Sequence, residues 1–307
     1  MIPAGAGPVR AGAMPFLYPV RRHGGRALSS LGRLAAGVAR EPVGGAAAVV
    51  VLAYIAGAAL APVIAPYSPT AADLAARLAP PSPAHWFGTD ALGRDVFSRT
   101  IYGARVSLLV GLLTVGLCVA IGTVLGMAGA YVRGWPDAAA ARTVELLQAF
   151  PYLIFAVAMM AFLGPGFWNV IWALALKGWI EFYRLARGET LAQAGREYVE
   201  AARAMGYPAS WILVSEILPN IANTVTVVAL LRLGYFMVLE ASLSFLGIGI
   251  PPGIPAWGSM ISEGRNVLFI AWWVSTIPGL ALLVLVLGVN LLGERIREIL
   301  DPHTASE

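Results

Sequence analysis

The chain has 307 residues, of which 58% are hydrophobic and only 12% are charged. Its mean hydropathy of +0.74 exceeds what a water-soluble globular domain of this length needs, so that class is excluded and an integral membrane protein is indicated. The formal net charge is +4, but no basic patch interleaved with aromatic residues indicates nucleic-acid binding.

Residues 1–42 are predicted to form an arginine-rich N-terminal tail, and residues 1–13 are so rich in Gly, Ala and Pro that translation could begin at Met1 or at Met14. The first span is predicted at about 43–65. It is too long and begins too late for an ordinary secretory signal peptide, so we interpret it as an uncleaved anchor.

The segment between the first and second spans contains His85, Asp90 and Asp95. These residue types could form a metal site or an acid–base pair. Glycines beside the two carboxylates favour turns and a helix cap, and Arg94 can neutralise one of them. We favour this structural interpretation, and the reactive one stays open.

A spanning helix needs about 20 apolar residues, and five further windows meet this requirement. They are predicted at about 106–132, 144–163, 167–186, 223–247 and 273–292. The charge-free run 146–176 would be about 46 Å long as one helix, which is too long for a hydrocarbon core of about 30 Å. We therefore divide it at the Gly-Pro-Gly sequence 164–166. The result is an all-α integral membrane domain of six transmembrane helices over 43–302, followed by a C-terminal tail at 303–307.

Ionisable residues inside a span are candidates for a substrate path. Lys177 and Glu181 are spaced i, i+4 in the fourth span, and Arg232 and Glu240 lie roughly 80° apart around the fifth. A path with both signs of charge would suit a peptide, which carries an ammonium and a carboxylate. The competing interpretation is that these groups neutralise each other or extend to the membrane interface.

A polar segment at about 187–222 separates the fourth and fifth spans, and it is too polar to enter lipid. Its distinctive residues are Glu200, Ala201, Ala202, Gly206, Leu218 and Pro219. The alanines would let a partner surface approach closely, the glycine permits a turn that a β-carbon would obstruct, and the proline restarts the chain toward the next span. The pattern indicates a helical docking element for another protein.

This pattern resembles the EAA loop of bacterial ABC-importer permeases, although Glu216 stands where that family often has histidine. Residues 85–111, 240–258 and 290–302 further resemble the second, C-type permease subunit of dipeptide, oligopeptide and nickel ABC importers. The resemblance covers about 43–302 and implies a type I ABC importer-like fold.

The resemblance also implies partners: a homologous permease in a heterodimer, one or two ABC ATPase subunits docked on the EAA loop, and an extracytoplasmic solute-binding protein. ATP and magnesium would be bound by the ATPase subunits, and no cofactor or metal is expected in this chain. Relatives with the same motifs handle dipeptides, oligopeptides, glutathione, opines or nickel chelates, and the sequence does not choose among them.

Several observations argue against an enzyme. A P-loop needs Gly-Lys followed by Ser or Thr, whereas the only lysine, Lys177, lies inside a predicted span. Nucleophile-elbow and zinc-protease motifs are absent from the sequence, and the single Cys118 excludes an intrachain disulfide. An ion-coupled secondary transporter is an alternative, but it would more often show an internal repeat. A membrane-bound enzyme would have to rely on the His85 group.

Six spans place both termini on one side of the membrane. Fourteen arginines lie in the tails and loops of that side and five on the other. The positive-inside rule then predicts that both termini and the 187–222 loop are cytoplasmic, in a multi-pass protein of the bacterial inner membrane.

Overall fold

The computed structural model describes residues 36–300, so the residues that decide between Met1 and Met14 and the tail predicted at 303–307 lie outside the described part. The described residues contain no β-strand, only an isolated bridge between Thr89 and Asp95. The longer helices are α2 (Pro42–Ala59), α4 (Val96–Val132), α5 (Trp135–Gln148), α6 (Tyr152–Leu163), α7 (Phe167–Ala194), α10 (Leu218–Phe245) and α12 (Trp273–Leu300). The shorter ones are α3 (Ala61–Ile64), α8 (Glu197–Ala204), α9 (Ala209–Trp211) and α11 (Trp257–Gly264).

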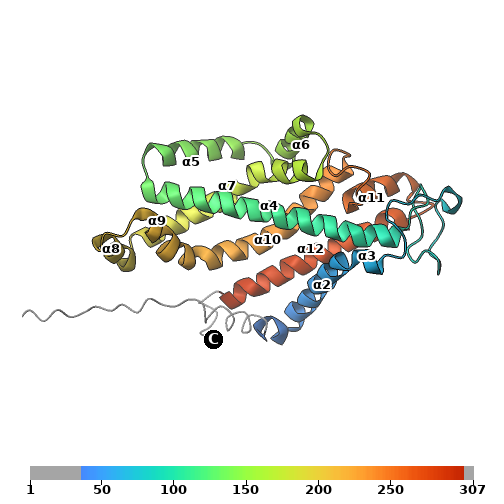
Figure 1. The fold of residues 1–307 in the computed structure, drawn as a ribbon, viewed down its shortest axis with the longest axis horizontal. Coiled ribbons are helices and arrows are strands. Elements are labelled where there is room, and N and C mark those ends of the chain that lie inside the picture. Colours follow the sequence, from blue (N-terminus) through green and yellow to red (C-terminus); the bar gives the residue numbers. More distant parts are fainter. Residues whose placement is uncertain (1–35, 301–307) are drawn as a thin grey trace, which may run out of the picture.

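The long helices lie side by side in an elongated bundle built from α4, α7, α10 and α12, and α2 packs against α12 (Figure 1). Helices α8 and α9 lie at one end of this bundle. The segment before α4 lies at the opposite end together with α11 (Figure 1). The predicted docking loop and the predicted outer segment are therefore far apart in space.

Within residues 36–300, four stretches of helix are long and apolar enough to cross a membrane: α2, α4, the continuous stretch Ala209–Phe245 and α12. The pair formed by α5 and α6 makes a fifth if this bent pair is one span. The all-α membrane class is thereby confirmed. The count of six stays a prediction, because it depends on α7, whose apolar part is interrupted by Lys177, Glu181 and Arg184.

The structure differs from the expectation most clearly at the third span, 144–163. Helix α5 ends at Gln148 and α6 begins at Tyr152, and the two helix axes differ in direction by 94°. Pro151 supplies the physical reason, because proline has no backbone N–H and disfavours helical geometry in the residue before it. The predicted break at 164–166 is confirmed, since α6 ends at Leu163 and α7 begins at Phe167.

Helices α4 and α7 are in backbone contact, and glycines on both helices permit it. A β-carbon on Gly122 would overlap the Trp179 carbonyl, and one on Gly126 would overlap the Tyr183 carbonyl. On the facing helix, a β-carbon on Gly178 would lie 2.6 Å from the Cys118 sulfur. Small residues four apart let membrane helices approach this closely, and dispersion contacts then hold them together.

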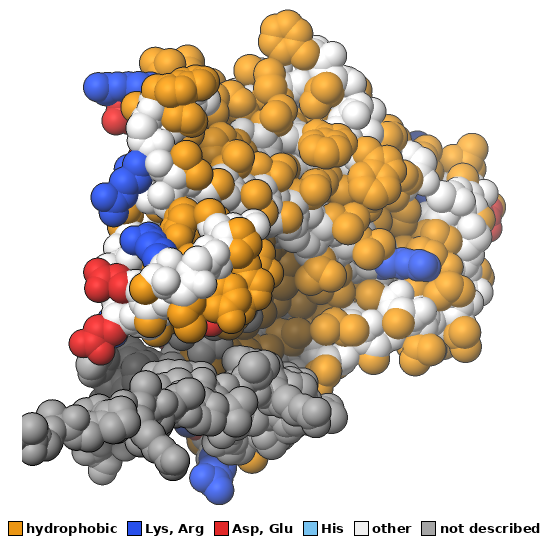
Figure 2. Space-filling view, turned by 60° about the vertical axis from the view of Figure 1, so that its left-hand side comes forward, with side chains coloured by type: hydrophobic (Ala, Val, Ile, Leu, Met, Phe, Trp, Pro, Cys, Tyr) orange, Lys and Arg blue, Asp and Glu red, His pale blue; other side chains and the backbone are white. Residues whose placement is uncertain are grey.

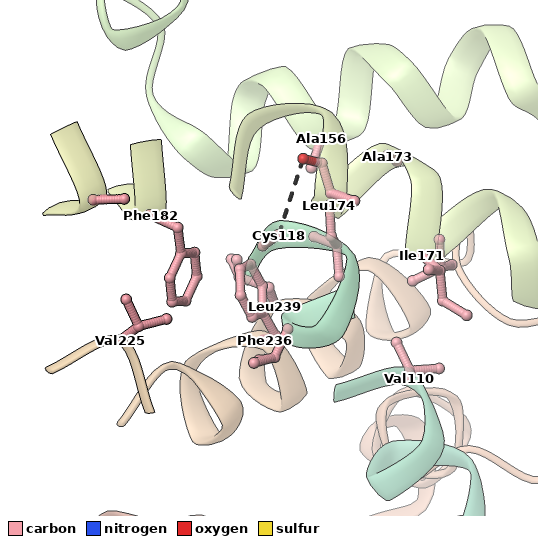
Figure 3. Close-up of a cluster of buried hydrophobic side chains, with 14 of the residues drawn as sticks. Val110, Cys118, Ala156, Ile171, Ala173, Leu174, Phe182, Val225, Phe236 and Leu239 are labelled. Atoms are coloured by element: carbon pink, nitrogen blue, oxygen red, sulfur yellow. Dashed lines mark hydrogen bonds between the residues drawn. The ribbon is translucent and has the colours of Figure 1, made fainter. Parts of the chain in front are cut away.

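The main core lies where α4, α6, α7 and α10 meet, and Figure 3 shows Phe182 and Phe236 beside the α4 segment that carries Cys118. The Cys118 thiol is fully buried and donates a long hydrogen bond to the Ala175 carbonyl, with an S···O distance of 4.0 Å. The expected role of this cysteine as a small apolar residue is therefore confirmed.

Candidate functional site

The predicted docking loop forms a short exposed helix, α8, that ends in a tight turn at Gly206. Glu200 and Ala201 are exposed, whereas Ala202 is only 2% exposed and packs with Val199 into the main core. Of the two alanines, only Ala201 is therefore free to meet a partner. Gly206 has a φ of 81°, and a β-carbon there would meet nothing within 4 Å. The glycine is needed for its backbone conformation, and the space beside it is open.

The other two residues of the motif stand at the start of α10. Leu218 is half-buried, and Pro219 is exposed at the second position of α10. A π-helical turn, Ile212–Ile217, joins α9 to α10 without a break in the helix. Pro219 therefore lies inside one continuous helical stretch rather than restarting the chain after a loop.

Next to Gly206 lies an exposed aromatic pair that the sequence reasoning missed. The rings of Tyr207 and Trp211 are stacked, with centroids 4.0 Å apart and planes 15° apart. Met205 beside them is 67% exposed, and Val214 is 61% exposed. This pair could have been predicted from the sequence, because aromatic residues four positions apart at the start of a helix lie on the same face. Figure 2 shows charged side chains gathered at this end of the molecule, beside a largely hydrophobic flank.

Polar contacts fix the loop to the bundle. Arg203 on α8 donates to the Tyr131 hydroxyl at the end of α4, over 3.1 Å, and its guanidinium lies over that ring. The Tyr198 hydroxyl donates to Gln193 at 2.8 Å. Burial, together with the negative charge of Glu216, raises the pKa of Tyr198 above its usual value, so this phenol stays neutral and able to donate. The loop is therefore held in a defined position relative to α4, α7 and α10.

Three of the four predicted path residues line one cleft between α5, α6, α7 and α10. The cleft has a volume of about 600 Å³, and its charged lining residues are Lys177, Glu181, Arg184 and Arg232. Tyr152, Tyr235 and Phe236 form its aromatic walls. Two segments far apart in sequence thus contribute to one polar space within an apolar bundle.

The charged groups of α7 in this cleft do not pair with each other. Lys177 does not pair with Glu181. Its ammonium donates to the Phe150 carbonyl and lies 5.7 Å from the centre of the Tyr152 ring. Glu181 forms its ion pair with Arg232 on α10 instead. The i, i+4 spacing allows a pair on one helix, but the bend between α5 and α6 places the Phe150 carbonyl beside Lys177.

Glu240 lies away from the cleft and is completely buried. Its carboxylate accepts hydrogen bonds from the Ser107 hydroxyl at 3.2 Å and from the Ser244 hydroxyl at 2.8 Å, and Ser244 in turn accepts from the Ile250 N–H at 3.1 Å. Glu240 therefore joins α4 to α10 and to the turn after α10. Its surroundings fit the packing interpretation, and it does not line the path proposed for the other three.

The outer segment has the structural role favoured by the sequence. Asp95 caps α4 by accepting from the Ser98 N–H at 2.8 Å and also contacts the His85 ring at 3.0 Å. Asp90 accepts from Arg94 at 2.7 Å and pairs with the buried Arg99. Within 36–300, no group of three or more His, Cys, Asp or Glu residues is placed to hold a metal.

The sequence reasoning missed the fourth member of this network. Glu263 on α11 lies 2.8 Å from a guanidinium nitrogen of both Arg94 and Arg99. Two arginines thus meet two carboxylates, so the network is neutral, and it joins the outer segment to α11. Nothing in the sequence around Glu263 indicated this contact.

Comparison with known proteins gives three similarities. Residues 119–306 match the family model described as binding-protein-dependent transport system inner membrane component. The chain is 42% identical over 226 residues to the glutathione transport system permease protein GsiD of Pectobacterium atrosepticum, covering 74% of this chain and 75% of the relative. It is 38% identical over 269 residues to the probable D,D-dipeptide transport system permease protein DdpC of Escherichia coli, covering 87% and 90%.

Among solved structures, the chain is similar to one of an inward-facing MetNI methionine ABC transporter. The TM-score is 0.53 at 20% sequence identity, and the match covers 65% of this chain and 95% of the other. At that identity the likeness concerns the fold alone.

Proposed function

The chain belongs to the family of binding-protein-dependent transport system inner membrane components, and from this premise we propose that it forms, with a homologous permease, the membrane path of an ATP-driven importer of peptides or related small solutes. It is a permease subunit of an ABC importer and an integral membrane protein. The named substrates of the relatives, glutathione and D,D-dipeptides, support the peptide class.

The cleft between α5, α6, α7 and α10 is the part of this chain that we assign to the path. It is the polar space that brings Lys177, Glu181 and Arg232 together inside a bundle of otherwise apolar helices. A peptide in transit carries an ammonium and a carboxylate, and this cleft offers groups of both signs. This observation carries the assignment, since unneeded charges inside a membrane are costly.

The partners proposed for the complex are one or two ABC ATPase subunits, which would bind ATP and magnesium, and an extracytoplasmic solute-binding protein. The Glu200–Pro219 segment is the proposed docking surface for the ATPases. Its support is the exposed face of α8 with Ala201, the open space beside Gly206 and the adjacent Tyr207–Trp211 pair. The chain itself would hydrolyse no ATP.

Replacing Gly206 with valine tests this docking role. A β-branched residue at a φ of 81° is strained by about 1–3 kcal/mol, so the turn should shift and the docking surface with it. We expect uptake in the assembled importer to fall by about fivefold or more, because about 1.4 kcal/mol corresponds to a factor of ten, while the subunit still inserts into the membrane. Uptake and ATPase copurification are the measurements.

Gly195→Val is the matched control for this experiment. Gly195 lies in the same loop, has open space around it and has an ordinary φ of −96°. It should therefore tolerate the same change. Equal uptake by the Gly206→Val and Gly195→Val importers would contradict the docking role of the turn.

The orientation is proposed from the arginine distribution and is tested by labelling single cysteines. Asp90 is buried, so Leu92, which is 46% exposed, is the better outer position, and Met205, 67% exposed, is the inner one. In a Cys118→Ala background, Leu92→Cys should react with an impermeant thiol reagent added to spheroplasts. Met205→Cys should react only in inverted vesicles. Labelling of both from the same side would contradict cytoplasmic placement of the docking loop.

A further inference from the structure

The lining of the cleft between α5, α6, α7 and α10 contains more positive than negative groups. Three cations, Lys177, Arg184 and Arg232, face one carboxylate, Glu181, which leaves a net charge of +2. We propose that this excess makes the cleft a selectivity step for solutes whose carboxylates outnumber their ammonium groups, with Lys177 and Arg232 as the residues that meet the carboxylate. The proposal rests on the proposed function and names the substrate class for that same path.

The ion pairs show which cations are available. Arg232 is paired with Glu181, and both side chains are still partly exposed, at 37% and 42%. Within residues 36–300, neither Lys177 nor Arg184 has a carboxylate within ion-pair distance. The Lys177 ammonium donates to the Phe150 carbonyl, and Arg184 lies 3.4 Å from the Gln148 amide oxygen. Both acceptors are neutral oxygens, so they do not cancel the positive charge of Lys177 or of Arg184.

The surroundings strengthen the field of these charges. Tyr152, Tyr235 and Phe236 line the same cleft, and Lys177 itself is buried. Low-dielectric walls around charges of one sign focus the field and raise the local concentration of the opposite ion by about 10-fold to 1,000-fold. Any solute that enters the cleft therefore meets a positive potential over an apolar wall.

The cations are also spread along the direction of α7. Lys177 is ten residues and Arg184 seventeen residues beyond the start of that helix at Phe167, which corresponds to about 15 Å and about 26 Å along its axis. A carboxylate that leaves one cation thus approaches the next. A peptide with uncharged side chains is a zwitterion without net charge, whereas an extra side-chain carboxylate gives it a net negative charge. The cleft favours the second kind.

The field is measured with charged thiol reagents, whatever the natural solute is. Gln148 is exposed in the cleft, so Gln148→Cys in a Cys118→Ala background gives a reporter in the assembled importer. The cysteine is modified with two methanethiosulfonate reagents, one carrying an anionic sulfonate and the other a cationic trimethylammonium group. The rate with the anionic reagent is divided by the rate with the cationic one. This ratio is then divided by the same ratio for free 2-mercaptoethanol, which corrects for the different reactivities of the reagents. We expect a normalised ratio of severalfold, up to about ten, since clefts lined by one sign concentrate the opposite ion by about tenfold or more and Glu181 offsets part of the positive field here.

Charge variants separate the contributions. Arg232→Gln and Lys177→Gln should each lower the normalised ratio severalfold, and Glu181→Gln should raise it. Arg142→Gln is the matched control, because this arginine is paired with Glu145 on the open surface and has a side chain that is 80% exposed. Its field is screened by solvent, so the ratio should stay unchanged. A ratio near one in the unaltered cleft would overturn the inference.

Uptake of two isosteric tripeptides, Ala-Glu-Ala and Ala-Gln-Ala, connects the field to transport. The binding protein is the same in every variant, so its preference cancels when each variant is compared with the unaltered importer. Lys177→Gln and Arg232→Gln should lower the relative uptake of the anionic tripeptide severalfold, and Glu181→Gln should raise it.

If the variants change the reagent ratio but leave the relative uptake of the two tripeptides unchanged, the cleft is not on the transport route and the proposal is overturned. Failure of the unaltered importer to take up either tripeptide would instead count against the proposed peptide class, and the selectivity step would fall with it.

Discussion

Replacing Gly122 with leucine should prevent α4 from packing against α7 and reduce the amount of folded subunit in the membrane. A β-carbon at this position would lie 2.6 Å from the Phe182 β-carbon and 2.8 Å from the Tyr183 backbone nitrogen, in addition to the overlap with the Trp179 carbonyl. Backbone atoms cannot relieve such an overlap by changing rotamer, as a flexible side chain can. The helices must therefore separate, and the contacts of the main core are lost with them.

The expected cost is at the upper end of the range for overpacking, about 3 kcal/mol or more, because the obstacle is backbone. Subunit abundance and the midpoint of thermal unfolding in detergent are the measurements. Gly116→Leu is a matched control on the same helix, since Gly116 is exposed and a β-carbon there meets nothing within 4 Å. If the Gly122→Leu and Gly116→Leu proteins are equally abundant and equally stable, the close contact of α4 and α7 is not what holds the bundle together.

Replacing Asp90 with alanine should have the second large effect, at the opposite end of the molecule. Asp90 accepts from the Leu92 and Arg94 backbone N–H groups with one carboxylate oxygen and meets Arg94 and Arg99 with the other. Arg99 is only 2% exposed, and without Asp90 it retains Glu263 as its carboxylate partner. The neutral network would then carry a net positive charge.

Removing one partner of a buried ion pair costs about 3–5 kcal/mol, because the remaining charge stays buried without full compensation. We expect Asp90→Ala to lower the thermal unfolding midpoint of the purified subunit and to loosen the outer segment against α11. The double variant Asp90→Asn with Arg99→Gln should recover part of this loss by restoring neutrality. Glu145→Ala, which breaks an exposed pair with Arg142, should cost less than about 1 kcal/mol. A midpoint for Asp90→Ala equal to that for Glu145→Ala would contradict a role for the network in stability.

The class of protein could be predicted from the sequence because the membrane imposes a simple length and polarity rule. The apolar windows that begin near Val43, Val106, Asn223 and Trp273 each overlap one of the four helical stretches that meet the requirement for a span. The type I importer-like fold, inferred from the resemblance, is confirmed by the family match and the fold likeness. Helix ends were less predictable. Helix α4 begins at Val96, because the Asp95 cap, and not the membrane boundary, sets its start.

Pairing of charges was the part that the sequence could not supply. Lys177 and Glu181 share one helix face at i, i+4, yet Glu181 pairs with Arg232, fifty-one positions later in the chain. The sequence indicated that Arg94 could neutralise one of the outer carboxylates without choosing between them, and the structure pairs it with Asp90. The further link from Arg99 to Glu263 depends on where α11 lies. Local spacing limits which partners a side chain can reach, and only helix packing decides which of them it meets.

The sequence by itself determined the membrane class and the approximate positions of four apolar helices, because each depends on residues close together in the chain. The tertiary structure alone decided that Lys177, Glu181 and Arg232 line one cleft while Glu240 is buried elsewhere. It also decided that Ala202 packs inward and Ala201 faces out. The physical reason is the close approach of α4, α7 and α10, which rotates each helix until its small residues meet and so fixes which polar side chains share a space.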